Sequence, residues 1–153
     1  MFDVYNEVKK QNLLDVFENG GKLDAFRHAF AMAYFSKYVS IRKLRKLGKA
    51  HEKGNYLQFL GNTNDEGGEL PDSLSSAMDL KNNEVGFSIA EEVKKLSVEE
   101  IKQKVFEQIQ SGKAFIIKRN KEGLYLDCAD NIISRGRIYK QWNIPKCLVA
   151  SDK

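Results

Sequence analysis

An acid, an arginine and a histidine lie close together in one apolar stretch of the chain, residues 22–38. On a helix, Asp24 has Arg27 at i+3 and His28 at i+4, so the three side chains can meet on one surface. Most other residues of the stretch are alanine, phenylalanine, tyrosine or methionine, and a helix that is apolar all round is a buried one. Charged side chains are rarely buried without partners. We therefore expect these three side chains to meet further polar groups inside the fold.

The second histidine also falls on a face that should be apolar. In a helix expected over residues 41–53, His51 shares one face with Leu44 and Leu47, at the spacing i, i+3, i+7. His51 should therefore point toward the core. Glu52 follows it directly.

A later helix, expected from about residue 72 to 96, has polar residues beside its apolar stripe. One edge carries an acid, two amides and a glycine: Asp79, Asn82, Asn83 and Gly86. The glycine would leave room for another helix or a ligand. If the three helices pack together, all these groups converge on one polar centre, in the way that helical bundles build cofactor and metal sites.

General base catalysis is one chemistry that fits these residues. His28 would be the base, and Asp24 or Asp79 would fix its tautomer and raise its basicity. Arg27 would be available for a phosphate or a developing oxyanion.

A metal site is a second chemistry that fits. His28 and His51, together with Asp79 or Asp24, could hold a zinc-like divalent ion, with Glu52 as the base on a bound water. The His51-Glu52 pair lacks a second histidine four residues after the first, so it is not the H-E-x-x-H zinc motif.

A purely structural role is the third interpretation. Buried polar networks can lock helices in register, with every group paired and no chemistry. The protein would then be a non-catalytic interaction module that binds a partner through the polar loop expected at 55–71 or through its C-terminal β edge.

The ordered motifs resemble those of an uncharacterised bacterial helical domain family of unknown function. Its pattern is D-x-x-R-H-A, then H-E about twenty residues on, then M-D-x-x-N-N-x-x-G, and it is similar to Asp24–Ala29, His51–Glu52 and Met78–Gly86 here. The resemblance covers about residues 20–92. It implies that these polar residues belong together, and that a secreted effector or toxin is one context for such a domain. It implies no particular activity.

The sequence predicts a mainly α (α+β) fold, with four or five helices and a small C-terminal antiparallel β element. Glycines and capping residues delimit helices over about 2–18, 23–38, 41–53, 72–96 and 98–111. Runs at 114–118 and 123–127 flank a turn and predict a β-hairpin, and the tail 132–149 is expected to add one or two short strands. We expect one domain, 1–153, with a helical part over about 2–111 and a β part over about 112–149.

The composition is that of an ordinary globular protein. The chain has 153 residues, of which 42% are hydrophobic and 30% charged. It has no apolar run long enough for a transmembrane helix and no signal-peptide pattern at its start. We therefore expect a soluble protein, either in the bacterial cytoplasm or secreted as part of a larger effector. Two cysteines, Cys128 and Cys147, are too few for a disulfide framework, and we expect both to be reduced.

A basic cluster accompanies the net charge of +4; its members are Arg42, Lys43, Arg45, Lys46 and Lys49. It could contact an anionic partner such as a membrane surface or nucleic acid. Because apolar residues run between the charges, we interpret it as the solvated face of an amphipathic helix. No zinc-finger spacing or Gly-rich RNA-binding signature accompanies it. The partners considered are therefore a protein or an anionic lipid substrate, and not a nucleic acid.

Taken together, the sequence favours a hydrolase-like effector domain that attacks an ester or phosphoester, with lipids and cell-wall precursors as the substrates considered. The catalytic candidates are His28, Asp24, Asp79, Arg27, His51 and Glu52, and the binding candidates are Asn82 and Asn83. A divalent metal is the cofactor considered.

Overall fold

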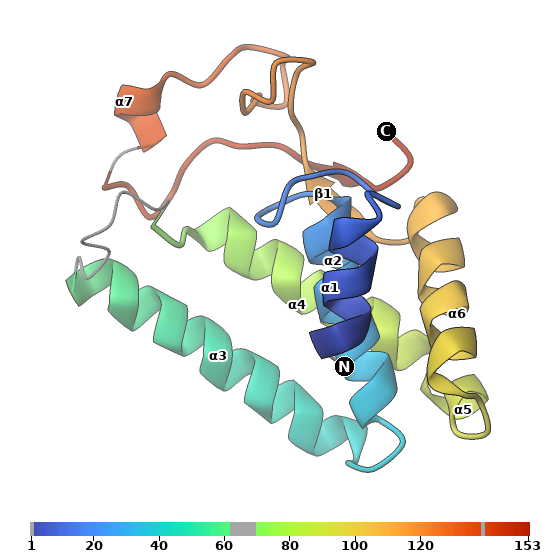
Figure 1. Ribbon diagram of the computed structural model, residues 1–153. Coiled ribbons are helices and arrows are strands. Elements are labelled where there is room, and N and C mark those ends of the chain that lie inside the picture. Colours follow the sequence, from blue (N-terminus) through green and yellow to red (C-terminus); the bar gives the residue numbers. More distant parts are fainter. Residues whose placement is uncertain (1, 62–69, 139) are drawn as a thin grey trace.

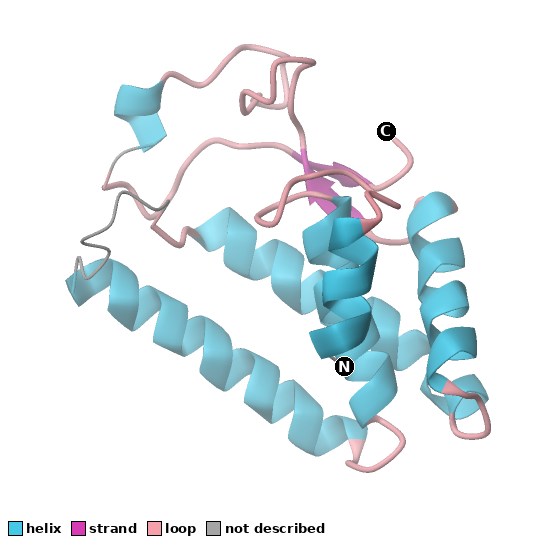
Figure 2. Cartoon of the chain, in the orientation of Figure 1, coloured by secondary structure: helices cyan, strands magenta, loops and turns pink. Residues whose placement is uncertain are grey.

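The chain is mainly helical with a small antiparallel sheet (Figure 1; Figure 2), in a computed structural model that describes residues 2–61, 70–138 and 140–153. The longer helices are α1 (Phe2–Lys10), α2 (Lys22–Phe35), α3 (Ile41–Gly61), α4 (Ser73–Ser88) and α6 (Val98–Gln110). Two single-turn helices, α5 (Ala90–Val93) and α7 (Arg135–Ile138), and two strands, β1 (Phe115–Ile117) and β2 (Leu148–Ala150), complete the described elements. The predicted mainly α fold class is confirmed, although the chain has more helical segments than the four or five expected.

The helix that carries Asp24, Arg27 and His28 lies at the centre of the fold. It packs against α4 on one side and α6 on another, and its alanines and phenylalanines form much of the core. Gly86 of α4 makes the first of these contacts possible, because a Cβ at this position would lie 2.3 Å from the carbonyl oxygen of Ala29. The predicted close approach of a helix at Gly86 is thus confirmed.

The first helix is shorter than predicted, because α1 ends at Lys10 instead of continuing to residue 18. The irregular segment that follows supplies the start of α2. Asp15 accepts hydrogen bonds from the backbone N–H groups of Lys22 and Leu23, at 2.6 and 3.1 Å. These N–H groups have no partner within the helix, so the Asp15 carboxylate acts as an N-cap while the N-cap residue itself, Gly21, offers no side chain.

The third helix is longer than predicted. It continues through Gly54 to Gly61, so the first part of the loop expected at 55–71 is helical, and its residues 62–69 lie outside the described part of the chain. The buried face of α3 consists of Leu44, Gly48 and Glu52. Leu47 is 60% exposed and His51 is exposed as well, so the prediction that both face the core is wrong.

The fourth helix begins where predicted and ends early. Asp72 caps it by accepting the N–H groups of Leu74 and Ser75, and it is itself buried against Lys146, whose Nζ lies 2.9 Å from its Oδ2. The helix breaks near Ile89 instead of running to residue 96. Helix α6 begins where predicted, and Ser97 forms a capping box with Glu100 at its start.

The β element differs from the predicted hairpin in its partner strand. Strand β1 pairs with β2 of the C-terminal tail, in the antiparallel register Phe115↔Ala150 and Ile117↔Leu148. The segment 123–127 turns back beside the residues that follow β1, through the antiparallel bridge Arg119↔Tyr125 and a hydrogen bond from the Leu126 N–H to the Lys118 carbonyl. The predictions of a short strand in the tail and of a turn between 114–118 and 123–127 are confirmed. The strand that pairs with β1 is β2, however, and not the segment 123–127.

The two cysteines form a disulfide, Cys128–Cys147, so the expectation of two reduced thiols is wrong. The disulfide links Cys128, which follows the segment 123–127, to Cys147, which directly precedes β2. Within the described residues, no helix is both long and apolar enough to cross a membrane.

Candidate functional site

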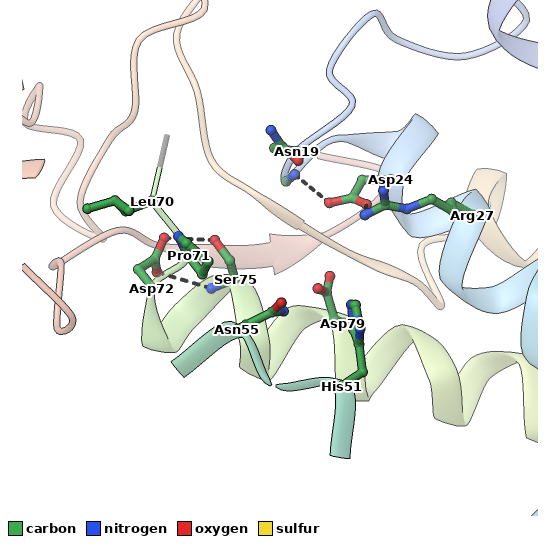
Figure 3. A pocket seen from close by; sticks show the side chains of 11 residues that line it. Asn19, Asp24, Arg27, His51, Asn55, Leu70, Pro71, Asp72, Ser75 and Asp79 are labelled. Carbon is green, nitrogen blue, oxygen red and sulfur yellow. Dashed lines mark hydrogen bonds and ion pairs between the residues drawn. The ribbon is translucent and has the colours of Figure 1, made fainter. Parts of the chain in front are cut away.

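A cavity of about 230 Å³ lies between α2, α3 and the start of α4 (Figure 3). Its polar lining comes from the turn before α2 and from α2 itself (Asn19, Gly20, Asp24, Arg27), from α3 (His51, Asn55) and from α4 with its cap (Asp72, Ser75, Asp79). Leu70 and Pro71 complete the wall. In Figure 3, Asp24 and Arg27 approach the cavity from one side, and Asp79 and His51 from the other.

Asp24 is held from both sides in the wall of this cavity. Its Oδ2 accepts the backbone N–H of Gly20 at 2.7 Å, and its Oδ1 accepts from Nη2 of Arg27 at 2.6 Å. Burial raises the pKa of Asp24, against the opposing effects of the Arg27 charge and the Gly20 N–H. Gly20 can turn its N–H inward because it adopts a φ of +78°, a conformation open to glycine.

His28 lies behind Asp24 and Asp79 and bridges two helices. Its Nδ1 is 3.3 Å from Oδ1 of Asn83 on α4, and its Nε2 is 3.3 Å from Oδ1 of Asp79 and 3.7 Å from Oδ1 of Asp24. Burial lowers the pKa of His28 to about 3, and the nearby Arg27 charge contributes to this lowering. The imidazole is therefore neutral at physiological pH.

Asp79 is the least satisfied carboxyl group of the site. It is 7% exposed, and its buried Oδ1 has no hydrogen-bond partner among the described residues. Burial raises the pKa of Asp79 to about 9, with added contributions from the charges of Asp24 and Glu52. Without a counter-charge, this group is protonated at neutral pH.

Two neighbouring residues of α3, His51 and Glu52, border the site with different exposure to solvent. Glu52 is buried; its Oε2 accepts from the Asn55 amide at 2.9 Å, whereas its buried Oε1 has no partner in the described part of the chain. His51 is exposed and lines the cavity directly. Among the described residues, the site thus contains two buried carboxylate oxygens that lack a donor, Oδ1 of Asp79 and Oε1 of Glu52, and such groups are costly.

Three of these side chains lie close enough together to hold a metal ion. One ligand atom each from Asp24, His28 and Asp79 lies within 4.8 Å of the others. The distances of 3.3 and 3.7 Å from His28 Nε2 to the two carboxylates are close to the separation of about 3.4 Å expected between ligands of a tetrahedral ion with bonds of about 2.1 Å. In addition, metal-bound histidines usually donate their other ring N–H to an oxygen, which is the position of Asn83 here.

The structure brings together most of the residues predicted from the sequence. Asp24, Arg27, His28, Asp79 and Asn83 are in contact, and Glu52 and His51 border them. Asn82 does not belong to this group.

Asn82 is fully buried elsewhere on α4. Its side chain donates to the carbonyl of Phe115 and accepts the N–H of the same residue, both at 2.9 Å. This pairing explains why an amide interrupts the apolar stripe: it fastens α4 to strand β1. The assignment of Asn82 as a ligand-binding residue therefore has no support in the cavity.

Several lining residues were not predicted from the sequence. Gly20 follows the first expected helix, Asn55 begins the expected loop, and Asp72 and Ser75 lie in the first turn of the helix expected at 72–96. Capping signals such as Asp72 identify a helix terminus but do not show that the terminus borders a cavity. The signal in the sequence for the contact of the Gly20 N–H with Asp24 is the glycine pair, Gly20 and Gly21, that precedes the helix containing this acid.

Comparison with known proteins gives a family and no described activity. No curated protein and no solved structure matches the chain. A family described as "Domain of unknown function (DUF6973)" matches residues 4–113. This match runs from α1 to just beyond α6 and includes every residue of the polar centre. It covers well over half of the chain, which therefore belongs to this family of unknown function.

Proposed function

We propose that this domain is a metal-dependent hydrolase that cleaves an ester or phosphoester, with Asp24, His28 and Asp79 as the ligands of a divalent ion. The observation that carries the proposal is the meeting of three buried ligand atoms within 4.8 Å, one of which, Oδ1 of Asp79, lacks any donor among the described residues. A cation between them would supply the missing positive charge. Two carboxylates and one imidazole suit ions such as Zn²⁺ or Mn²⁺.

The electrostatics of His28 favour a role as ligand over a role as general base. A base that operates near neutral pH needs a pKa near 7, and burial lowers the pKa of His28 to about 3. The residue beside its Nδ1 is the neutral amide of Asn83, whose hydrogen bond orients the ring and raises its pKa by less than burial and the Arg27 charge lower it. A neutral, oriented imidazole is the form that binds a metal ion.

Three protein ligands leave a coordination position for water, as catalytic sites require. A bound divalent ion would supply a water of lowered pKa as the nucleophile. We assign the acceptance of its proton to Glu52, whose Oε1 has no partner among the described residues, or to His51, which lines the cavity.

Arg27 is suited to the charge that develops on the substrate. Its side chain is 46% exposed and contacts Asp24 and His28 through the same Nη2, at 2.6 and 3.3 Å. The guanidinium thus contacts the same two atoms, Asp24 Oδ1 and His28 Nε2, that a bound cation would contact. With an ion held by Asp24, His28 and Asp79, Arg27 would be released from these two contacts and could pair, within the cavity that it lines, with a phosphoryl or carbonyl oxygen.

The decisive experiment combines metal content, stability and activity. The purified protein is analysed for bound metal, and its melting temperature is measured with chelator and with added Mn²⁺ or Zn²⁺. Activity is measured on bis-p-nitrophenyl phosphate and p-nitrophenyl esters. Asp24→Asn and Asp79→Asn should abolish metal binding and activity together. Asp130→Asn, which removes one exposed carboxylate at a positive φ that asparagine tolerates, is the matched control.

A different set of results would support the structural alternative. If no metal binds and the unmodified protein cleaves none of these substrates, the polar centre is a register-fixing network. The domain would then be an interaction module, and its partner would have to be sought on the surface.

A further inference from the structure

Helix α3 concentrates the positive charge of the protein. It contains six basic residues and one acid, Glu52, so this helix alone carries more net positive charge than the whole chain, whose net charge is +4. The single acid is buried and turned inward. None of the negative charge of α3 therefore faces solvent.

The outward face of α3 combines this charge with exposed leucines. We call it the outer stripe, and its members are Lys43, Lys46, Leu47, Ala50, Lys53 and Leu57. They follow the spacing i, i+3, i+4, i+7, i+10, i+14, which is one face of a helix, and all six are exposed. This face lies opposite the buried Leu44, Gly48 and Glu52.

The two leucines of the outer stripe are unusually open for a globular surface. Leu47 is 60% exposed and Leu57 is 56% exposed. Three residues before the helix begins, Tyr38 is also exposed. Single exposed hydrophobic residues are common, but here they alternate with lysines along one face that packs against nothing described in this chain.

The lysines of the outer stripe make no ion pair with other described residues, unlike Arg45 at its edge. The edge residue Arg45 pairs with Glu84 of α4 through two contacts of 2.6 and 2.7 Å. By contrast, Lys43, Lys46 and Lys53 make no ion pair within the described residues. Their charges are therefore available to an external partner.

We infer that the outer stripe of α3 docks on a membrane surface that contains anionic lipids. A helix with lysines and leucines on one face can lie in the interface plane, with leucines in the acyl boundary and the ammonium groups at the lipid phosphates. Long lysine side chains reach the head groups while their methylene stems stay in apolar surroundings. The charge complementarity is direct, because an anionic leaflet attracts each basic residue near its surface.

A nucleic acid fits the same charge less well. Phosphate contacts to a nucleic acid gain nothing from exposed leucines between the lysines. Burial of Leu47 and Leu57 is favourable only against an apolar phase. The leucines thus distinguish a lipid surface from a polyanion in water.

Docking through this face does not depend on the chemistry proposed for the cavity. The outer stripe and the cavity share only the helix, whose His51 and Asn55 line the cavity. Failure of hydrolysis would leave the docking inference untouched, and the reverse also holds.

Vesicle co-sedimentation tests the inference with the whole chain. Vesicles of phosphatidylcholine alone are compared with vesicles that also contain phosphatidylglycerol, at low salt and at about 0.5 M NaCl, where exposed charges are largely screened. We expect binding to the anionic vesicles only, and loss of binding at high salt. Lys43→Glu/Lys46→Glu should weaken binding at least about tenfold, because each basic residue near an anionic surface contributes on the order of a fivefold factor.

Two further variants isolate the contributions. Lys95→Glu/Lys121→Glu makes the same change of net charge at exposed sites on other parts of the chain and should retain binding. Leu47→Ser/Leu57→Ser keeps every charge and should also weaken binding, which a purely electrostatic contact would not show. Circular dichroism confirms that each variant is folded.

Three outcomes would overturn the inference. The first is no binding of the unmodified protein to anionic vesicles. The second is equal loss of binding in the outer-stripe and control charge variants, which would reduce the effect to net charge. The third is salt-dependent binding to a single-stranded oligonucleotide that the leucine variant does not change, together with absence of vesicle binding, which would assign the face to nucleic acid.

Discussion

The Nδ1 of His28 on α2 lies 3.3 Å from the amide Oδ1 of Asn83 on α4. Because an amide oxygen only accepts hydrogen bonds, the proton of the neutral ring sits on Nδ1, and Nε2 presents its lone pair to Asp79 and Asp24. A contact between two helices thus selects the tautomer and aims the nitrogen. It also makes Asn83 a positioning residue for any ion held at this point.

Asn83→Asp should raise the pKa of His28 from its value of about 3. A carboxylate beside Nδ1 favours the protonated imidazole, and protonation competes with metal binding. The titration is followed by NMR of the imidazole protons, with His51→Gln used to identify the second histidine. Asn143→Asp, at an exposed position, adds the same charge elsewhere and should leave the His28 titration unchanged. An unshifted pKa in Asn83→Asp would show that the contact does not govern the ring.

Asp79→Asn should stabilise the metal-free protein at alkaline pH and remove its pH dependence there. With a folded pKa of about 9, Asp79 keeps its proton where the unfolded chain has lost it, so folding is disfavoured as pH rises. Between pH 6.5 and 9 the unfolding free energy should fall by up to about 1.4 kcal/mol per pH unit. Urea denaturation at several pH values measures this slope, which should be nearly flat in the variant.

Below pH 6.5 a second group opposes this trend. His28 has its folded pKa lowered to about 3, so the unfolded chain binds a proton that the folded chain does not, and stability falls as pH decreases. The two contributions offset each other between about pH 4 and 6.5. If the unfolding free energy of the unmodified protein already fell with rising pH from pH 4 upward, the assignment of a neutral buried His28 would be contradicted.

Metal binding should release one proton between pH 6.5 and 9. The ion needs an ionised Asp79, whereas His28 is already neutral in this range. The affinity should rise about tenfold per pH unit up to pH 9 and then level off. Isothermal titration calorimetry in buffers of different ionisation enthalpy counts the proton directly. Zero protons released would mean that Asp79 is not a ligand.

Local spacing predicted the part of the site that lies on one helix. Asp24, Arg27 and His28 occupy one surface of α2 as the i, i+3, i+4 rule requires. The face of α3 was misassigned because only one of Leu44 and Leu47 is buried, and hydropathy does not say which one. The structure settles this by burying Gly48 and Glu52 beside Leu44, and no apolar pattern signals a buried acid.

The pairing of β1 with β2 and the disulfide could not be predicted from the sequence, for a different reason. A turn and two strand-like runs are local features, but strand β1 pairs with a segment about thirty residues away. The disulfide depends on the same event, because Cys147 directly precedes β2. Sequence spacing carries no information on that proximity.

Two glycine-to-alanine changes should have opposite effects on stability. Gly54 lies in the exposed part of α3, where an added Cβ would meet no atom within 4 Å, so Gly54→Ala should stabilise by about 1 kcal/mol through helix propensity. Gly86→Ala would place a methyl group 2.3 Å from the carbonyl oxygen of Ala29 and should destabilise by about 2 kcal/mol or more. Thermal unfolding of both variants checks the pair. Similar effects at the two sites would contradict the close contact of α2 with α4.

Removal of the disulfide should lower stability without changing the site. The cross-link joins residues 19 positions apart, for which the loop-entropy model gives a stabilisation of roughly 3 kcal/mol. Cys128→Ser/Cys147→Ser should therefore unfold at lower urea, and mass spectrometry should find no alkylated cysteine in the unreduced parent protein. The affinity for metal should remain, because Asp24, His28 and Asp79 are positioned by α2 and α4. A loss of affinity in this variant would show that the C-terminal segment, through Lys146 and the helix cap Asp72, also holds the cavity in shape.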